Sequence, residues 1–463
     1  MKLIYNVEDK PKFSQLIIFS LQQLLAIITA TIVVPILVNA NSVQNLNNGL
    51  QNLNMDPAAA LFGAGIGTIV YLLFTKSKSP VFLGSSFAFL SSLFSATAFG
   101  FFGVIMGAVF AGLVYVVIAL IIKAVGSGWL NKLMPPVVIG PTVALIGLSL
   151  ATNAVGDFTK SSATGEAYSL TAIACGLVTL FVTVIVSAKG KGFWKLIPFL
   201  VGILAGYLAA SVFTAIGNAA NIEALKVIDY SALVNNFESI TVSSFLHLPK
   251  FAFVEAFNEI KAGNIPSLAD FGSLMLLYMP VAFVVFAEHV ADHKNISSII
   301  ERDLLENPGL DKTLLGDGVG SIAGAFFGCC PNTTYGESVA CVAVTRNASA
   351  VTIWGTAILA MLLSLFSPFV AFVNTIPSCV LGGICVVLYG FIAVSGLKMI
   401  QSVDIGEDRN LFVVAAILVL GIGDLVFRFG ALQITSIAAA LIVGIAVNQI
   451  LKTKEEKAAA QNK

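Results

Sequence analysis

The sequence predicts an all-α polytopic membrane protein with fourteen transmembrane segments arranged as a 7+7 inverted repeat. Composition, a succession of long apolar runs, and motifs that recur in two halves of the chain all support this fold. Of the 463 residues, 57% are hydrophobic and only 11% are charged, and the mean hydropathy is +0.93. A soluble protein with so few charged residues could not cover its surface, so the chain uses lipid as its solvent. The net charge of zero argues against nucleic acid as a partner.

Fourteen apolar runs follow one another along the chain. They cover residues 14–37, 58–75, 81–98, 101–123, 135–152, 169–188, 196–217, 273–292, 314–328, 332–345, 350–373, 376–396, 410–427 and 431–451. An even number of spans places both termini on one side of the membrane. Of the 25 Lys and Arg residues, 20 lie on that side. Because cytoplasmic loops are enriched in these residues, we expect a multi-pass protein of the plasma (inner) membrane with both termini in the cytoplasm.

Three short motifs recur in the same order in the two halves of the chain. Gly63–Ile69 resembles Gly316–Ile322, Phe82–Phe87 resembles Phe326–Pro331, and Met134–Gly140 resembles Ile376–Gly382, at offsets of 253, 244 and 242 residues. The partners are seven spans apart, and an odd separation inverts their orientation in the membrane. An inverted repeat generates inward-open and outward-open states around one central site. The repeat therefore favours a transporter over an enzyme, and we expect no cofactor.

The third and tenth spans are interrupted by polar residues, glycine and proline. They begin with SPVFLGSSFAFLSS and with GCCPNTTYGESVA. In lipid, a broken helix is tolerated only where its backbone faces protein or a water-filled cavity. The free N–H and C=O groups of such breaks can bind a polar solute, helped by the positive end of the half-helix that follows. The sequence therefore places the central site at these two breaks.

Four acidic residues in or beside the apolar runs stand out as candidates for function. Acids within a membrane are costly and indicate function. Glu288 lies near the end of span eight, Asp292 is one helical turn further on the same face, and Glu337 follows the break in span ten. These three are the candidate site residues. Asp317, in the glycine-rich start of span nine, is a weaker candidate because it is expected near the cytoplasmic interface.

Two histidines accompany these acids but do not predict a metal site. His289 and His293 beside Glu288 superficially resemble a zinc-binding helix, but the HExxH order is absent and Lys294 follows at the expected cytoplasmic edge. We therefore expect no metal, and we expect both histidines to be bystanders near the cytoplasmic exit. The six cysteines show no CxxC spacing and are expected to be small core residues.

At PNTTYGES and AEHVADH the chain resembles the nucleobase–ascorbate transporter (nucleobase:cation symporter-2) family, most closely its bacterial uracil permeases. The resemblance extends over LQQLLAIITATIVVPIL, LGSSFAFLSS and LYGFIAVSG. It implies fourteen spans in two inverted repeats, with short antiparallel strands in spans 3 and 10 that meet at the substrate. A core domain (spans 1–4 and 8–11) would pack on a gate domain (spans 5–7 and 12–14). The implied divisions are core 1–125 and 273–374, gate 126–217 and 375–452, an extracytoplasmic loop 218–272, and a cytoplasmic tail 453–463.

The resemblance also implies six substrate-binding residues. They form three pairs, namely Glu288 with Glu337, Phe87 with Gly336, and Tyr335 with Tyr389. The two carboxylates would hydrogen-bond the base, and backbone groups of the second pair would complete the site. The first tyrosine would line the site, and the second would approach it from the gate domain.

Two positions depart from the pattern of the uracil permeases. The first span has Gln22-Gln23 where Gln-His is common, and Asp292 stands where those permeases can carry a histidine that supports proton coupling. The proton-coupling group must then be a carboxylate, either Glu288 and Asp292 as an interacting pair or Glu337. Two acids in a partly dry site can share one proton at neutral pH.

Together these features predict a proton-coupled uracil importer that works by alternating access of the gate domain against the core domain. A xanthine or other nucleobase symporter is the nearest alternative, and an anion transporter of the same fold is a more distant one. Na⁺ remains open as the coupling ion. The family implies a homodimer through the gate domains.

Overall fold

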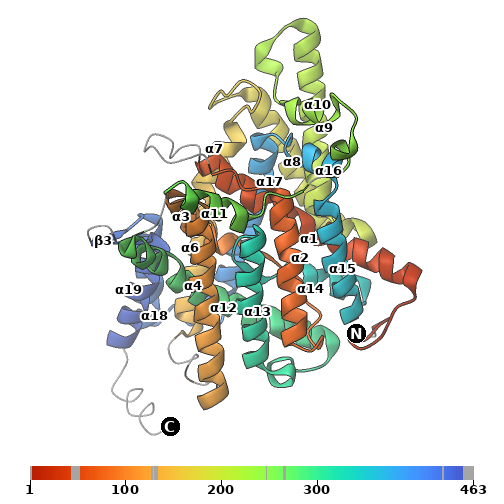
Figure 1. Ribbon diagram of the computed structural model, residues 1–463. Helices are drawn as coiled ribbons and strands as arrows, with labels where there is room; N and C mark the ends of the chain where they lie inside the picture. The colour runs from red at the N-terminus through yellow and green to blue at the C-terminus, as the bar shows by residue number, and fades with distance from the viewer. Residues whose placement is uncertain are drawn as a thin grey trace.

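The computed structural model describes residues 3–42, 53–126, 129, 134–246, 248–263, 267–429 and 432–451 (Figure 1). The predicted cytoplasmic tail, 453–463, lies outside the described residues. The described chain is almost entirely helical. Helices dominate because apolar segments in lipid must satisfy every backbone N–H and C=O within the segment.

The helices of the first half precede a connecting segment that is itself partly helical. They are α1 (Phe13–Ser42), α2 (Pro57–Phe74), η2 (Phe87–Phe89), α3 (Leu90–Ala96), η3 (Thr97–Phe99), α4 (Gly100–Val125), α6 (Pro136–Ser149), α7 (Ala151–Thr159), α8 (Leu170–Lys189), η4 (Gly192–Leu196) and α9 (Pro198–Ala220). The connecting segment contains η5 (Glu223–Leu225), α10 (Ser231–Phe237), η6 (Val242–Ser244) and α11 (Ala252–Lys261).

The second half begins with the longest helix and contains three of the four strands. Its helices are α12 (Leu268–Ile300), η7 (Leu305–Gly309), α13 (Leu310–Phe327), α14 (Gly336–Thr345), α15 (Ala350–Ser364), α16 (Ser367–Val373), α17 (Ser378–Ile400), α18 (Asp408–Ile422) and α19 (Ser436–Ile450). The strands are β1 (Leu83–Ser85) in the first half and β2 (Asn332–Thr334), β3 (Phe427–Phe429) and β4 (Leu432–Ile434) in the second.

Eight helical stretches of the described residues are long and apolar enough to span a membrane. They are Phe13–Ala40, Pro57–Phe74, Phe87–Val125, Pro136–Thr159, Leu170–Lys189, Pro198–Ala220, Leu268–Ile300 and Ser378–Ile400. Shorter apolar helices are α14, α15 and α19. The chain is thus an all-helical, multi-pass membrane protein, as predicted. The count of fourteen spans stays a prediction.

Helices α2 and α13 cross at glycines, which lets their backbones touch. A Cβ on Gly67 would lie 2.8 Å from the carbonyl oxygen of Gly320, and a Cβ on Gly320 would lie 2.6 Å from that of Gly67. Gly63 and Gly324 approach in the same reciprocal way. These contacts agree with the alignment of residues 63–69 with 316–322, which equates Gly67 with Gly320. In Figure 1, α13 lies between α2 and α4, against both of which it packs.

Helices α6 and α17, one from each half of the chain, also pack closely through glycines. Each begins directly after a proline, Pro135 or Pro377, which acts as the N-cap residue. A Cβ on Gly140 would meet Gly396, and a Cβ on Gly382 would meet the α7 backbone. The alignment of residues 134–140 with 376–382, at an offset of 242, therefore agrees with where both helices start.

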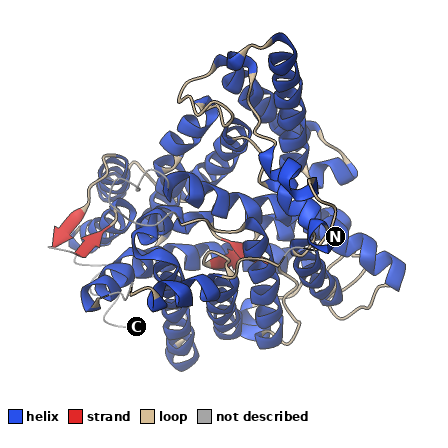
Figure 2. Cartoon of the chain, turned by 45° about the horizontal axis from the view of Figure 1, so that its top comes forward, coloured by secondary structure: helices blue, strands red, loops and turns tan. Residues whose placement is uncertain are grey.

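Two short strands lie at the centre of the helical bundle (Figure 2). β1 pairs antiparallel with β2, with Leu83 opposite Thr334 and Ser85 opposite Asn332. The predicted antiparallel strands in spans 3 and 10 are thus present. The alignment of residues 82–87 with 326–331 was wrong, because the strands equate Leu83 with Asn332, five residues further along. That alignment matched glycine to glycine, whereas the strand in the second half follows Pro331.

The last two apolar runs are shorter helices than predicted. α18 ends at Ile422, and a β-hairpin of β3 and β4 occupies residues that the runs 410–427 and 431–451 assigned to helices. Gly423 and Asp424, the latter with φ of +53°, turn the chain out of the helix.

The connecting segment is attached to the N-terminal ends of two helices. The Glu259 carboxylate accepts hydrogen bonds from the backbone N–H groups of Phe101 (3.1 Å) and Phe102 (3.3 Å) at the start of α4. Asp56, the N-cap of α2, accepts one from the N–H of Lys250 (2.9 Å). Both contacts put a negative charge at a helix N-terminus, where it is stabilising.

Candidate functional site

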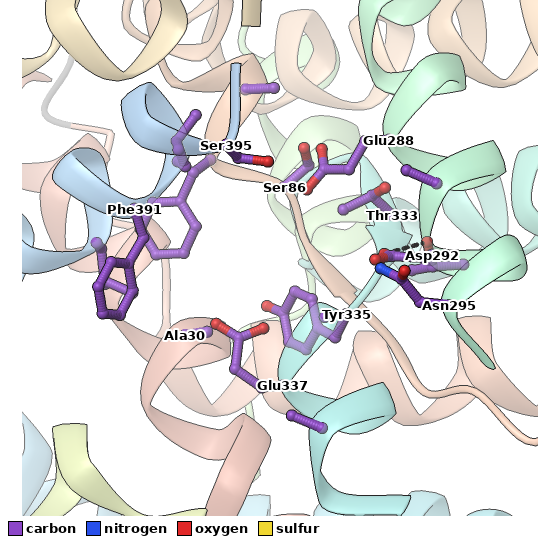
Figure 3. Close-up of a pocket in the computed structure, with 18 of the residues that line it drawn as sticks. Ala30, Ser86, Glu288, Asp292, Asn295, Thr333, Tyr335, Glu337, Phe391 and Ser395 are labelled. Atoms are coloured by element: carbon purple, nitrogen blue, oxygen red, sulfur yellow. Dashed lines mark hydrogen bonds between the residues drawn. The ribbon is translucent and has the colours of Figure 1, made fainter. Parts of the chain in front are cut away.

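A cavity of about 460 Å³ lies where the two strands end (Figure 3). Its lining comes from α1, the β1–η2 and β2–α14 breaks, α12, and on the far side α6, η4, α9 and α17. The cavity therefore lies between helices that are far apart in the sequence. Most of its walls are apolar, and the polar groups are few and concentrated on α12 and at the two breaks.

Both breaks present the N-terminus of a helix to the cavity. After β1 the chain enters η2 at Phe87, and after β2 it enters α14 at Gly336. The first N–H groups of a helix have no partner within the helix and carry a partial positive charge. Phe87 and Gly336 both line the cavity, so these backbone groups can bind carbonyl oxygens of a solute.

Two carboxylates approach the cavity from opposite sides. Figure 3 shows Glu288, on α12, and Glu337, in the first turn of α14, with the open space of the cavity and the Tyr335 ring between them. The Glu288 side chain is exposed to this space, and that of Glu337 is partly exposed. Carboxylates placed in this way can accept hydrogen bonds from N–H groups on two edges of a flat solute.

Asp292 lines the same cavity and is tied to the second break. Its Oδ2 accepts a hydrogen bond from the Thr334 hydroxyl at 2.8 Å, and a Cβ on Gly336 would lie 3.8 Å from its Oδ1. Asp292 is mostly buried, with 8% of its surface exposed. The structure thus brings Glu288, Asp292 and Glu337 to one cavity, together with Asn295 one turn beyond Asp292.

Tyr335 holds the two breaks against each other. Its hydroxyl donates to the carbonyl oxygen of Ser85 at 3.0 Å and lies 3.3 Å from the Thr31 hydroxyl of α1. Its ring covers Gly84, where a Cβ would lie 2.3 Å from the ring. Only glycine fits at that position. The sequence resemblance placed Tyr335 at the site, and here it lines the cavity.

Gln23, one of the two positions that depart from the expected pattern, supports the site without lining the cavity. Its side-chain amide donates to the Ser338 hydroxyl and, at 3.2 Å, to the Ser338 carbonyl. The same hydroxyl accepts the N–H of Phe82 at 3.0 Å. Gln23 is buried and does not line the cavity. Its contacts connect α1 to the first turns of α14 and to the start of β1.

Tyr389 lies one layer further from the cavity. Its ring meets that of Phe87 edge-on, with centroids 6.2 Å apart, and only 2% of the residue is exposed. The cavity wall on this side is made by other residues of α17, among them Phe391 and Ser395 (Figure 3). Phe391 and Ser395 are four residues apart and therefore lie on one face of α17, the helix that contains Tyr389. This spacing is the signal that could have identified them as lining residues.

The two histidines are core residues and not the bystanders that the sequence suggested. His289, His293 and Asp317 are fully buried and hydrogen-bonded. Their expected position near the cytoplasmic side of the membrane stays a prediction. The eighth apolar run was ended before Lys294, whereas α12 continues to Ile300. The i,i+4 spacing of His289 and His293 is the signal that could have placed both on one buried face of α12.

The cysteines are core residues, as predicted. All six are free and buried. Within the described ranges, no group of three or more His, Cys, Asp or Glu side chains is arranged to hold a metal ion.

An all-helical membrane protein with a cavity that is lined by a few polar groups and lies at two broken helices belongs to the class of solute transporters. Two solved structures share its fold. The transmembrane domain of the cyanobacterial bicarbonate transporter BicA matches with a TM-score of 0.56 at 13% identity, covering 96% of this chain and 100% of that one. The murine anion transporter Slc26a9 matches with a TM-score of 0.61 at 10% identity, covering 96% and 69%.

The sequence comparisons identify the family. The profile of the xanthine/uracil permease family, described as Permease family, matches residues 14–428. The uracil permease of Bacillus caldolyticus is 37% identical over 461 residues, covering 99% of this chain and 96% of that protein. The uracil permeases of Bacillus subtilis (36%; 99% and 97% covered) and Escherichia coli K12 (33%; 96% and 94%) are also similar. The chain belongs to this family of nucleobase permeases; it is a transporter and not an enzyme.

Proposed function

We propose that this permease imports uracil together with protons across the cell membrane. One observation carries the proposal: Glu288 and Glu337 lie on opposite sides of one cavity, into which two helix N-termini also point. Similarity over nearly the full length to three bacterial uracil permeases supports the choice of base.

The chemistry of uracil complements this arrangement. Its two N–H groups can donate to the carboxylates Glu288 and Glu337, and its two carbonyl oxygens can accept from the backbone N–H groups at Phe87 and Gly336. The apolar remainder of the wall, including Phe391, can cover the ring faces. A site with a partner for each polar edge rejects analogues that leave one of its buried groups unpaired. Tyr335 lines this site, and Tyr389 supports Phe87 from the gate side.

Coupling to protons would use the carboxylates of the same cavity. Glu288, Asp292 and Glu337 line one cavity, where Lys195 is the one basic side chain among the described lining residues, so the excess of carboxylates favours uptake of a proton. Glu288 and Asp292 as a pair, or Glu337, would take up a proton outside with uracil and release it inside. Protonation of Asp292 would weaken the hydrogen bond that its Oδ2 accepts from the Thr334 hydroxyl, because a neutral acid is a poorer acceptor than a carboxylate.

Alternating access would move a gate domain (126–217 and 375–452) against a core domain (1–125 and 273–374). Packing supports this division, because α13 packs against α2 and α4 whereas α17 packs against α6 and α8. The cavity between the two groups of helices would then open to either side. Fourteen spans, both termini in the cytoplasm, a 218–272 segment outside, and a homodimer through the gate domains belong to the same proposal.

The decisive experiment is uptake of radiolabelled uracil into proteoliposomes that contain the purified protein. An imposed pH gradient, acidic outside, is expected to drive accumulation above equilibrium, and a Na⁺ gradient alone is not. If only a Na⁺ gradient drives accumulation, the coupling ion is Na⁺ and not the proton. Competition with unlabelled xanthine and thymine separates uracil from the alternative bases, since only a preferred substrate blocks uptake at low concentration.

An anion is the second candidate substrate, because the solved structures of similar fold are of a bicarbonate transporter and an anion transporter. The three acids of the cavity argue against it, since a cavity that carries several carboxylates repels anions. Bicarbonate or chloride flux without any nucleobase uptake in the same proteoliposomes would decide for the anion.

A further inference from the structure

Helix α12 carries two polar faces with different partners. Glu288 and Asp292 line the cavity. His289 and His293, each the next residue along, lie on another face of α12 that does not line the cavity, and both are fully buried. The two imidazole rings stack, with centroids 4.1 Å apart and planes 28° apart. The transport cycle proposed above uses the acidic face and leaves the histidine face without a role.

His289 ties α12 to α13 through two hydrogen bonds. Its Nδ1 lies 2.7 Å from Oδ2 of Asp317, and its Nε2 lies 3.1 Å from the Thr313 hydroxyl. That hydroxyl donates its own hydrogen to the Leu310 carbonyl at 3.1 Å, so it accepts the Nε2–H of His289. The contact between Nδ1 and Oδ2 then needs a second proton. His289 and Asp317 together are therefore neutral, with one proton shared between them.

His293 ties α12 to α2 in a similar manner. Its Nδ1–H donates to the His289 carbonyl at 2.8 Å, which leaves Nε2 as an acceptor, 2.7 Å from the Tyr71 hydroxyl and 3.3 Å from the Ser79 hydroxyl. The Tyr71 hydroxyl donates to Ser79 Oγ at 2.6 Å. The rings of His289 and His293 stack and share no hydrogen bond with each other. The cluster is thus an anchor on two helices and not a continuous path for protons.

We propose that His289 and Asp317 are positioning residues, which hold α12 in the rotation that presents Glu288 and Asp292 to the cavity. The proposal rests on the uracil function stated above. Successive side chains on a helix point about 100° apart, so fixing the direction of His289 fixes that of Glu288. Asp317 depends on this one bond, because its Oδ1 has no hydrogen-bond partner among the described residues.

The test compares substitutions of Asp317 that differ in hydrogen bonding but not in size. Asp317→Asn keeps a donor toward His289 Nδ1 and is neutral, as the native pair is; Asp317→Leu removes the bond. Uracil affinity of the purified protein is expected to stay within about threefold in D317N and to fall at least about tenfold in D317L.

His289→Leu should lower uracil affinity as much as D317L does. The double variant should bind uracil no more weakly than either single variant, since both substitutions remove the same interaction. Thr356→Val, which removes a buried hydroxyl between α15 and α1, controls for general loosening.

A second readout needs no substrate. Asn295→Cys places a thiol on the cavity face of α12, and its maleimide labelling rate is expected to change at least about threefold in D317L but not in D317N. Unchanged affinity and labelling in folded D317L would overturn the positioning role. So would a D317N variant as impaired as D317L with a shifted pH dependence of binding, because the carboxylate charge, acting on Glu288, Asp292 and Tyr115 nearby, would then be what matters. If Asn295→Cys labels as expected with and without D317L but wild-type protein binds no uracil, the result counts against the proposed function alone.

Discussion

The two breaks at the centre of the molecule have the same backbone design and different side chains. In the first half, β1 leads into η2 at Phe87, and no acidic residue lies in the turns that follow. In the second half, β2 leads into α14, whose first turn contains Glu337. The strands pair with each other, so both helix N-termini meet at one cavity. The repeat therefore gives both breaks the same backbone geometry. The acidic side chain at the breaks, Glu337, comes from the second half alone.

The supporting contacts show the same asymmetry. From the second break, the Tyr335 ring covers Gly84 and the Ser338 hydroxyl accepts the N–H of Phe82, whereas the first break contributes mostly backbone groups to these contacts. The first break thus acts as a backbone platform, and the second supplies the side chains that contact it and that would bind the solute. Substitutions in each half of the chain test this difference between the two breaks.

The largest effect is expected for Glu337→Gln, which removes the only charge of the second break. Uracil uptake should fall by more than about 100-fold, because the hydrogen bond from the base to the charged carboxylate would contribute about 3 kcal/mol and is lost in the amide. Radiolabelled uptake in proteoliposomes measures it, with the exposed Glu306→Gln as control. Uptake at wild-type affinity and still driven by protons would refute the site.

Asp292→Asn tests whether the α12 carboxylate that is hydrogen-bonded to the second break carries the coupling proton. The amide can still contact the Thr334 hydroxyl but cannot exchange a proton, so uracil should still bind within about tenfold of wild type. Accumulation driven by a pH gradient should be lost, whereas exchange of labelled for unlabelled uracil should persist. Unaltered accumulation would assign coupling to Glu288 or Glu337 alone.

The central glycines should respond in opposite ways. In Gly84→Ala the new Cβ would lie 2.3 Å from the Tyr335 ring, so we expect a loss of about 1–3 kcal/mol in stability, seen as a lower melting temperature. In Gly336→Ala the nearest atom is Asp292 Oδ1 at 3.8 Å, so stability should be kept while the methyl group narrows the cavity and weakens uracil binding. Equal melting temperatures for the two variants would contradict the platform role of the first break.

The smallest effect concerns Glu259, which caps α4, the helix that follows the first break. Burial raises the pKa of Glu259 above its ordinary 4.5, opposed by the hydrogen bonds from Phe101 and Phe102. The folded protein then binds this proton more tightly than the unfolded chain does. Its contribution to stability is present below a pH of about 4.5 and is lost as the pH rises through the folded value. Glu259→Gln should flatten this dependence, with less than about 1 kcal/mol of change in melting experiments.

Different parts of the fold were predictable from the sequence to different degrees. Apolar runs revealed the long helices because lipid requires such runs, and Pro135 and Pro377 marked equivalent helix starts. The hairpin after Ile422 was missed, because its residues are as apolar as those of the helices beside it. The five-residue error in aligning the two breaks arose from matching Gly84 to Gly328, since three-residue strands carry too little pattern to align.

The sequence by itself determined that the chain is a multi-pass membrane protein with an internal repeat, and its motifs pointed to a nucleobase permease. Composition and spacing suffice there, because the bilayer restricts which segments can span it. Only the tertiary structure decided which acids share the cavity and which polar residues are buried behind it. Glu288 and His289 are neighbours in the chain, yet one faces the cavity and the other faces Asp317, because the rotation of α12 is set by what packs on each side. Such packing depends on contacts between residues far apart in the sequence, which no local pattern records.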